Sequence, residues 1–169
     1  MLLIVSNSFH QTASYIVEKY GINHFRLNTD EIEKYEYDYS NHDGIQLSRD
    51  GYSITENEID SIYFRKIHFR QYDEIDPVYH DFQRRELFSY ITGIVNQYDG
   101  KVLSKPEKIY SADNKIRQLK IAQKVGFTIP ETHFTNSKTK VNEFIQSKKY
   151  IIKPIATGKI EKNGKFETI

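Results

Sequence analysis

Two lysines stand where an ammonium group could hold a phosphate. Lys153 lies inside the apolar segment 150–154, where burying an ammonium costs desolvation free energy unless an anion compensates it. Lys115 follows Asn114 at the start of a predicted helix, where unpaired N–H groups and the helix dipole favour anions. Lysine also offers phosphate a compact positive charge. Taken singly, each lysine is better explained as a solvated surface residue, so only their combination with other features can favour a phosphate site.

Small residues follow the second lysine. The segment 156–158 comes directly after Pro154, and its short side chains would let the backbone approach a ligand. The pair Asn163-Gly164 lies in the middle of the stretch 159–169 and predicts a hairpin there. The predicted ligand-binding residues are therefore Lys115, Lys153, Thr157 and Gly158.

The other polar residues indicate no metal site. The six histidines show no metal-ligand spacing, at positions 10, 24, 42, 68, 80 and 133. The chain has no cysteine, which excludes disulfides, thiolate metal sites and cysteine nucleophiles. No Gly-x-x-x-x-Gly-Lys-Ser/Thr loop is present, which excludes a P-loop nucleotide site. We expect no metal ligand in these 169 residues and assign no catalytic residue among them.

Composition narrows the class of protein. The 24 Lys and Arg residues nearly balance the 23 Asp and Glu residues, so net charge supplies no broad field for a nucleic-acid backbone. The 13 tyrosines and 10 phenylalanines argue against a disordered chain. The first apolar run is too short for a signal peptide and has no basic residue before it. No run approaches the roughly 18 apolar residues of a membrane span. We expect a cytoplasmic globular protein with neither nucleic-acid nor membrane partners.

The first part of the chain has the pattern of an α/β domain. An apolar strand at 2–6, a helix at 12–20 ended by Gly21, and a strand at 24–27 form a βαβ unit. Alternating residues and two Asp-Gly turns predict a small meander over 35–54. A strand at 62–66 then places Arg65 and Lys66 at its carboxyl end, where ligands gather in open α/β sheets.

A long helix over 77–98 follows, and a strand at 101–103 completes this part. The apolar face of that helix is predicted to comprise Val78, Phe82, Phe88, Ile91, Val95 and Tyr98. Pro106 breaks the chain, so we place a domain boundary near residue 104.

The second part repeats helices and strands. A helix over 112–125 is predicted to turn Ile116, Leu119, Ala122 and Val125 inward. A strand at 132–135 and a helix capped by Asn136 or Ser137 come next. The apolar segment 150–154 is predicted to be a strand that carries Lys153.

The order of these motifs resembles the ATP-grasp superfamily. The matching features are the segment 111–115, Gln118-Leu119, the Gly126-x-x-Ile129-Pro130 turn, Thr132 and Ile151-Ile152-Lys153-Pro154. The resemblance implies that Lys115 and Lys153 contact ATP phosphates and that the following hairpin covers the triphosphate. It also implies the fold class: residues 1–104 form a Rossmann-like pre-ATP-grasp α/β domain, and residues 105–169 begin an ATP-grasp domain.

Within that superfamily the chain resembles the graspetide (microviridin-type) maturases of ribosomal peptides. The features shared with this branch are Leu27-Asn28-Thr29-Asp30, Tyr63-Phe64-Arg65-Lys66, Glu86 and the segment 132–136. The family typically has Arg-Arg where this chain has Arg65-Lys66, and lysine lacks bidentate geometry. The resemblance implies an enzyme that phosphorylates an Asp or Glu side chain of a precursor peptide. A Ser, Thr or Lys side chain then attacks the acyl phosphate and forms an ester or amide crosslink.

The same resemblance implies partners and parts that lie elsewhere. The partners are a precursor peptide with a leader segment and a second copy of the chain. The magnesium ligands, the adenine site and the catalytic residues are expected beyond Ile169, so the 169-residue chain alone is expected to be inactive. Two alternatives stay open: another carboxylate–amine ATP-grasp ligase, glutamate-adding or glutathione-synthetase-like, and a non-catalytic peptide-binding or dimerisation module.

Overall fold

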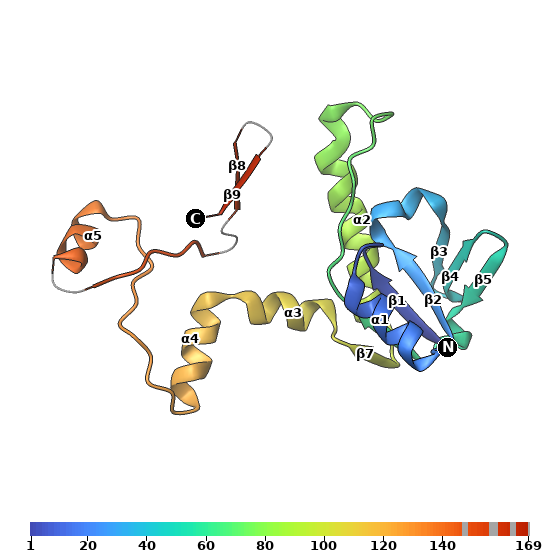
Figure 1. The fold of residues 1–169 in the computed structure, drawn as a ribbon, viewed down its shortest axis with the longest axis horizontal. Helices are drawn as coiled ribbons and strands as arrows, with labels where there is room; N and C mark the ends of the chain where they lie inside the picture. Colours follow the sequence, from blue (N-terminus) through green and yellow to red (C-terminus); the bar gives the residue numbers. More distant parts are fainter. Residues whose placement is uncertain (147–148, 156–158, 163–164, 169) are drawn as a thin grey trace. The chain divides into compact units, whose positions relative to one another are not determined.

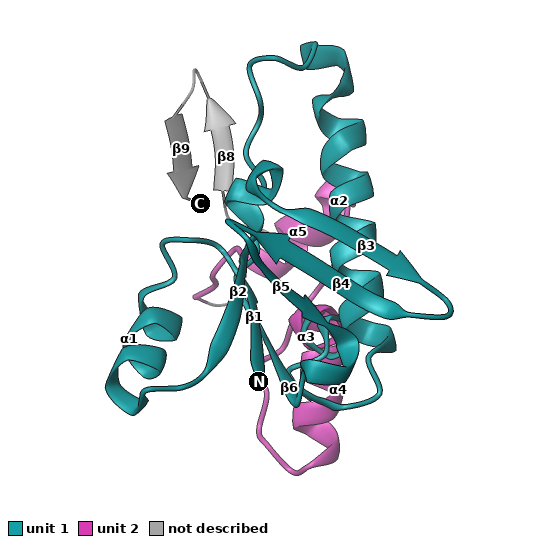
Figure 2. Cartoon of the chain, turned by 90° about the vertical axis from the view of Figure 1, so that its right-hand side faces the viewer, with its two compact units in different colours: residues 1–109 teal, residues 110–169 magenta. Residues whose placement is uncertain are grey.

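The computed structural model describes residues 1–146, 149–155, 159–162 and 165–168 (Figure 1). The chain divides into two compact units, Met1–Ile109 and Tyr110–Ile169 (Figure 2). The domain boundary near residue 104 stays a prediction. No helix among the described residues has the length and apolar character needed to cross a membrane.

A four-stranded parallel sheet forms the centre of unit 1. Its strands lie in the order β2-β1-β6-β7, and their bounds are β1 (Leu2–Ser6), β2 (His24–Asn28), β6 (Ser61–Phe64) and β7 (Lys101–Leu103). The apolar run of β1 is buried on both faces, since Leu3, Ile4 and Val5 are each at most 1% exposed. The predicted α/β fold is therefore confirmed.

The predicted βαβ unit is also present. Helix α1 (Gln11–Tyr20) joins β1 to β2 and ends at Gly21, whose backbone has φ 57°. Glycine adopts this left-handed conformation without the steric cost that a Cβ atom brings. The helix begins one residue before the predicted position.

A three-stranded antiparallel sheet extends unit 1, as the meander predicted. It consists of β3 (Glu36–Ser40), β4 (Gly44–Arg49) and β5 (Tyr52–Thr55). Two short 3-10 helices, η1 (Thr29–Lys34) and η2 (Glu56–Glu58), flank the sheet and were not predicted. Glu58 closes a capping box with Thr55 at η2, which explains why so short a helix is stable.

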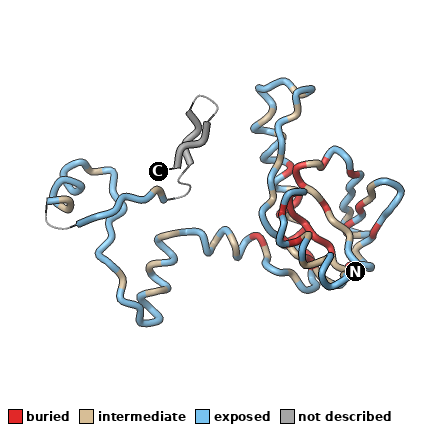
Figure 3. The backbone as a smooth tube through the Cα atoms, in the orientation of Figure 1, coloured by how far each residue is buried: buried red, intermediate tan, exposed pale blue. Residues whose placement is uncertain are grey.

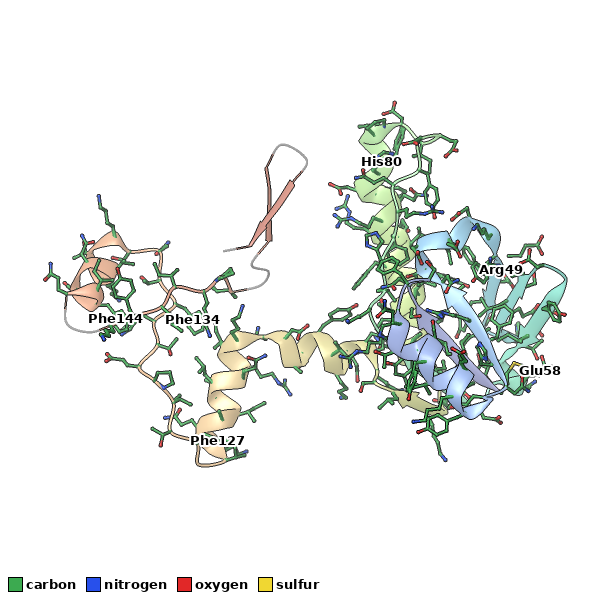
Figure 4. All side chains as sticks on the ribbon, viewed as in Figure 1. Arg49, Glu58, His80, Phe127, Phe134 and Phe144 are labelled. Atoms are coloured by element: carbon green, nitrogen blue, oxygen red, sulfur yellow. The ribbon has the colours of Figure 1, made fainter. Side chains whose placement is uncertain are left out.

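The hydroxyl group of Tyr35 closes the outer edge of β2. It accepts a hydrogen bond from the backbone N–H of Asn28 at 3.1 Å and donates one to the carbonyl of Arg26 at 2.9 Å. Arg49, labelled in Figure 4, donates to the same hydroxyl at 2.7 Å. Among the described strands only β1 pairs with β2, so this buried side chain takes the place of a neighbouring strand.

Helix α2 (Pro77–Gln97) covers one face of the core with its second half only. The side chain of Asp76 caps its first turn by accepting from the N–H of Val78. Its buried residues are Leu87, Ile91, Thr92, Ile94 and Val95, followed by Tyr98. The predicted apolar face was wrong at Val78, Phe82 and Phe88, which are 73%, 57% and 39% exposed. In Figures 1 and 2 the first turns of α2 extend beyond the ends of the strands, where no core reaches them.

The carboxyl end of α2 is held by a lysine. The ammonium of Lys105 donates to the carbonyls of Asn96 at 2.8 Å and Tyr98 at 3.2 Å. A cation is favoured at this end by the unpaired carbonyls and the helix dipole. The contact fastens the segment after β7 to the helix.

The helices and strands of the second part differ from the prediction. The elements are α3 (Pro106–Asp113), α4 (Lys115–Lys124), α5 (Lys138–Ile145), β8 (Lys159–Lys162) and β9 (Lys165–Thr168). The single helix predicted over 112–125 was wrong, because Asn114 has extended backbone angles and its side chain caps a new helix by accepting from the N–H of Arg117. The predicted cap Ser137 is confirmed, since its hydroxyl accepts from Lys140. The antiparallel hairpin is present as β8 and β9, and its predicted turn, Asn163-Gly164, lies outside the described residues.

Two predicted strands are absent from the described part of unit 2. A strand needs a neighbouring strand for its backbone hydrogen bonds. Residues 132–135 and 150–154 have no such neighbour there, and neither segment forms a strand. None of the residues of unit 2 whose burial the structure describes is buried (Figure 3). Of the inward positions predicted in the 112–125 helix, Ile116 and Val125 were wrong, being 46% and 64% exposed, whereas Leu119 and Ala122 are partly buried.

Candidate functional site

Lys115 is the first residue of α4, as the capping pattern predicted. The side chain of Asn114 accepts from the N–H of Arg117 at 2.9 Å and fixes the start of the helix. The first turn of α4 contains no acidic residue. An anion at this position would therefore meet the positive end of the helix without competition from a carboxylate in that turn.

The Lys115 side chain reaches the segment that carries the second predicted lysine. Its ammonium donates to the carbonyl of Pro154 and, at 2.8 Å, to that of Ile155. These two carbonyls come directly after Lys153 and are about 40 residues away along the chain. The structure therefore brings the helix start and the 153–155 segment together within unit 2.

Lys153 lies in a more open environment than its sequence indicated. Its neighbours Ile151 and Ile152 are 78% and 76% exposed, and Lys153 itself is exposed. The strand predicted around this ammonium is absent from the described residues, and the exposure of Lys153 agrees with a solvated lysine. Lys153 makes no ion pair with any described residue. The other two predicted binding residues, Thr157 and Gly158, lie outside the described residues.

Aromatic side chains also line this part of the chain. Phe127, Phe134 and Phe144 are labelled in Figure 4, and the first two are 70% and 39% exposed. The ring of His133 contacts that of Phe144, with centroids 4.8 Å apart. These contacts are local, and they join α5 to the segment before it without forming a closed core.

A second polar cluster, which the sequence did not predict as a whole, lies at the carboxyl ends of β1 and β6. His10 is only 5% exposed, and its ring is stacked on that of Tyr63 with centroids 6.1 Å apart. The N–H of Arg65 donates to the carbonyl of Val5 at 3.0 Å, which continues the β1–β6 pairing by one residue. Arg65 and Lys66 were predicted at this edge, whereas His10 had no sequence signal.

The electrostatics of this edge are positive. Burial first, and then the charges of Lys66, Arg26 and Arg65, lower the pKa of His10. The guanidinium of Arg26 donates to Ser14 and to the carbonyl of Asn7, each at 2.7 Å. These surroundings therefore favour the neutral form of the imidazole over the charged form.

Metal ligands do not gather in the described residues. No group of three or more His, Asp or Glu side chains there is placed to hold a metal ion. Carboxylate oxygens are the ligands that magnesium prefers. The described residues therefore contain no preformed cluster of carboxylates for a metal ion.

Comparison with known proteins gives a fold but no family model. No family model matches the sequence. An uncharacterised protein of Methanocaldococcus jannaschii is 32% identical over 84 residues, which cover 49% of this chain and 21% of that protein.

Solved structures match nearly the whole chain. The macrocyclase MdnC of Microcystis aeruginosa, bound with the precursor peptide MdnA, is 20% identical with a TM-score of 0.89 and matches 100% of this chain. A RiPP-associated ATP-grasp ligase of Chryseobacterium gregarium, in complex with ADP and a leader and core peptide, is 23% identical over 99% of the chain with a TM-score of 0.79. The macrocyclase MdnB of Microcystis aeruginosa is 26% identical over 86% of the chain with a TM-score of 0.70.

The chain spans 60%, 54% and 51% of these three structures, respectively. Both predicted lysines lie within the matched part of MdnC, since that match covers the entire chain. The parallel sheet, the meander and the helices described above are thus those of a known enzyme fold. The chain therefore has the fold of these ATP-grasp ligases of ribosomal-peptide maturation and is similar to between half and two thirds of their length.

Proposed function

We propose that the chain supplies the phosphate-binding part of an ATP-grasp peptide ligase. The observation that carries this proposal is the contact of the Lys115 ammonium with the carbonyls of Pro154 and Ile155. It holds one predicted phosphate ligand beside the segment of the other, Lys153. The fold likeness to ligases solved with ADP and peptide supports the same reading.

The proposed substrate is a precursor peptide with a leader segment. ATP supplies a phosphoryl group that activates an Asp or Glu side chain of the peptide. A Ser, Thr or Lys side chain of the same peptide then replaces the phosphate and forms an ester or amide crosslink. The MdnC and Chryseobacterium structures, which contain their own peptides, support a peptide partner here. A homodimer and the use of magnesium are part of the same proposal.

The two lysines act electrostatically in this proposal. Lys115 and Lys153 hold the phosphate chain and neutralise the negative charge that develops during transfer. Lys115 approaches from a helix start, whose N–H groups add partial positive charge. Thr157 and Gly158 are proposed to bring backbone N–H groups to the same phosphates. Magnesium ligands are proposed to come from outside the described residues.

Nucleotide binding tests the assignment directly. Titration calorimetry of the full-length protein with ATP and magnesium should show at least a tenfold loss of affinity in Lys115→Ala and in Lys153→Ala, because each variant loses a charge-assisted contact worth about 1.5–3 kcal/mol. Lys120→Ala is the matched control, since Lys120 is an exposed lysine of the same helix.

The result that contradicts the proposal is ATP affinity that stays within twofold of the wild type in both lysine variants. Equal losses in Lys120→Ala would show that only overall charge matters. If ATP binds normally but ADP release stays independent of any added precursor peptide, the peptide-ligase part fails while the nucleotide site stands.

A further inference from the structure

The carboxyl ends of β1 and β6 lie at the switch point of the parallel sheet. From the central strand β1 the chain passes to β2 on one side, and it later returns to β6 on the other side. In open α/β sheets the crevice at such a point is where ligands bind. Helix α1, which is ten residues long, also begins here, so the N–H groups of its first turn lie at this edge.

The start of α1 has no capping side chain. His10 occupies the cap position without making a side-chain cap bond, and the first turn contains no acidic residue. The helix start therefore keeps its partial positive charge. A helix start alone attracts anions without selecting one, so a specific site also needs side chains around it.

His10 provides an independent observation. Its side chain is 95% buried, yet its Nδ1 atom has no hydrogen-bond partner among the described residues. An unpaired buried polar atom is destabilising, so such atoms are rare in folded proteins. The imidazole is stacked on Tyr63, which precedes Arg65 by two residues and therefore lies on the same face of the strand.

Two cations lie beside His10, and no acidic side chain among the described residues pairs with them. Arg65 and Lys66 are exposed, and neither forms an ion pair with a described residue. The acid on this edge, Asp30, is already engaged, because it accepts from the backbone N–H of Ser8 at 2.7 Å and from its hydroxyl at 2.6 Å.

The framework around these groups is fixed before any ligand arrives. The side-chain amide of Asn7 donates to the carbonyl of Lys66 at 2.5 Å. The guanidinium of Arg26 donates to the carbonyls of Asn7 and Ser8 at 2.7 and 3.2 Å. The loop from β1 to α1 is thereby fastened to β2 and to the residues after β6, which reduces the ordering cost of binding.

We propose that this edge of unit 1 is an oxyanion-binding site, formed by His10, Arg65, Lys66 and the start of α1. Arg65 offers a carboxylate or phosphate two parallel N–H groups, and Lys66 adds a point charge. The site uses none of the residues of the nucleotide proposal, so the two stand or fall separately.

Histidine-detected NMR of the full-length protein tests this site. The probes are inorganic phosphate and N-acetyl-aspartate amide, which carries one side-chain carboxylate, each added at constant ionic strength. We expect saturable shifts of the His10 ring and of the Gln11 and Thr12 amides, together with a rise in the pKa of His10. The anion that binds more tightly identifies the ligand of this site as either a peptide carboxylate or a phosphate.

Substitutions show whether anion binding depends on this site or on positive charge elsewhere in the chain. Arg65→Gln with Lys66→Gln should weaken binding at least tenfold, and Arg65→Gln alone should weaken it less. The matched control Arg84→Gln with Arg85→Gln, two adjacent cations of α2, should leave it unchanged. Lys115→Ala with Lys153→Ala should also leave the His10 shifts intact, whatever happens to ATP binding. The amide signals of Leu27 and Ile91 report whether each variant retains its core.

Two results would overturn the proposal. One is the absence of saturable His10 shifts with either anion. The other is unchanged binding in the Arg65→Gln, Lys66→Gln variant while the Leu27 and Ile91 signals keep their positions.

Discussion

Unit 1 and unit 2 differ in how far they bury their apolar side chains. Unit 1 has a continuous core in which the sheets and α2 bury side chains such as Leu3, Leu27 and Ile91 to 0% exposure. Unit 2 is rich in apolar residues but buries none of those that the structure describes. Its exposed apolar residues include Ile116, Ile121, Val125, Phe127, Ile151 and Ile152.

The difference separates stability from the proposed chemistry. Burial of apolar surface is the main source of folding free energy, so the stability of the described chain resides in unit 1. The two proposed phosphate lysines lie in unit 2, where few buried contacts resist local opening. Unit 2 can therefore rearrange around a nucleotide at a low cost in free energy. The bound nucleotide then has to offset the conformational entropy that is lost when the unit becomes ordered.

The largest expected effect contrasts one core residue with one surface residue. Ile91→Ala removes a fully buried side chain of α2, and we expect it to lower the free energy of unfolding by about 2–5 kcal/mol. Ile121→Ala, at a position 48% exposed in α4, should change it by less than about 0.5 kcal/mol. Urea unfolding followed by circular dichroism measures both. Equal losses would mean that unit 2 shares a cooperative core with unit 1.

The next effect concerns a hydroxyl group in unit 1. Tyr35→Phe removes the partner of Arg26, Asn28 and Arg49 at once. We expect a loss of about 1–3 kcal/mol, because two backbone groups at the edge of β2 lose their hydrogen bonds. Tyr52→Phe is the matched control, since Tyr52 is 78% exposed. Denaturant midpoints that coincide for the two variants would show that water replaces the hydroxyl without cost.

A smaller and local effect is expected in unit 2. Asn114→Ala removes the cap of α4, which is typically worth about 1 kcal/mol. Amide hydrogen exchange within α4 should therefore become about fivefold faster, while exchange in unit 1 stays unchanged. Asn136→Ala is the control, because Ser137 and not Asn136 caps α5. Faster exchange in both units would contradict the separation between them.

The smallest effect is a pH dependence that belongs to unit 1. Burial and neighbouring cations lower the pKa of His10 from its ordinary value of 6.5. Below that value the unfolded chain binds a proton that the folded chain does not bind, so stability falls as pH decreases through 6.5 toward the lowered pKa. The free energy of unfolding, measured from about pH 5 to about pH 8, should depend less on pH in His10→Gln than in the wild type. His24→Gln, which alters an exposed ring, should keep the wild-type slope.

Local patterns predicted unit 1 well because its own contacts satisfy them. The apolar run of β1, Gly21 after α1, and the two Asp-Gly turns of the meander each specify structure over a few residues. The start of α2 is the exception, because Val78 and Phe82 follow the helical period but extend beyond the strands. Periodicity indicates which face of a helix is apolar, and it does not indicate how far the core reaches.

Unit 2 was predicted less well for a physical reason. The segments 132–135 and 150–154 have strand-like sequences, but a strand forms only against a partner. The cap Asn114 competes with helix continuation through its own side chain, which a search for apolar period overlooks. At the candidate sites, the sequence predicted Lys115, Lys153, Arg65 and Lys66. It had no signal for His10, whose importance comes from burial and not from spacing.

The tyrosine at the edge of β2 also determines how the sheet can associate with other chains. An open parallel edge invites pairing with a strand from another molecule, which leads to aggregation or domain swapping. Tyr35 satisfies one N–H and one C=O of that edge with a single hydroxyl, so an incoming strand would first have to displace a buried side chain. The four-stranded sheet is therefore protected against growth on the β2 side.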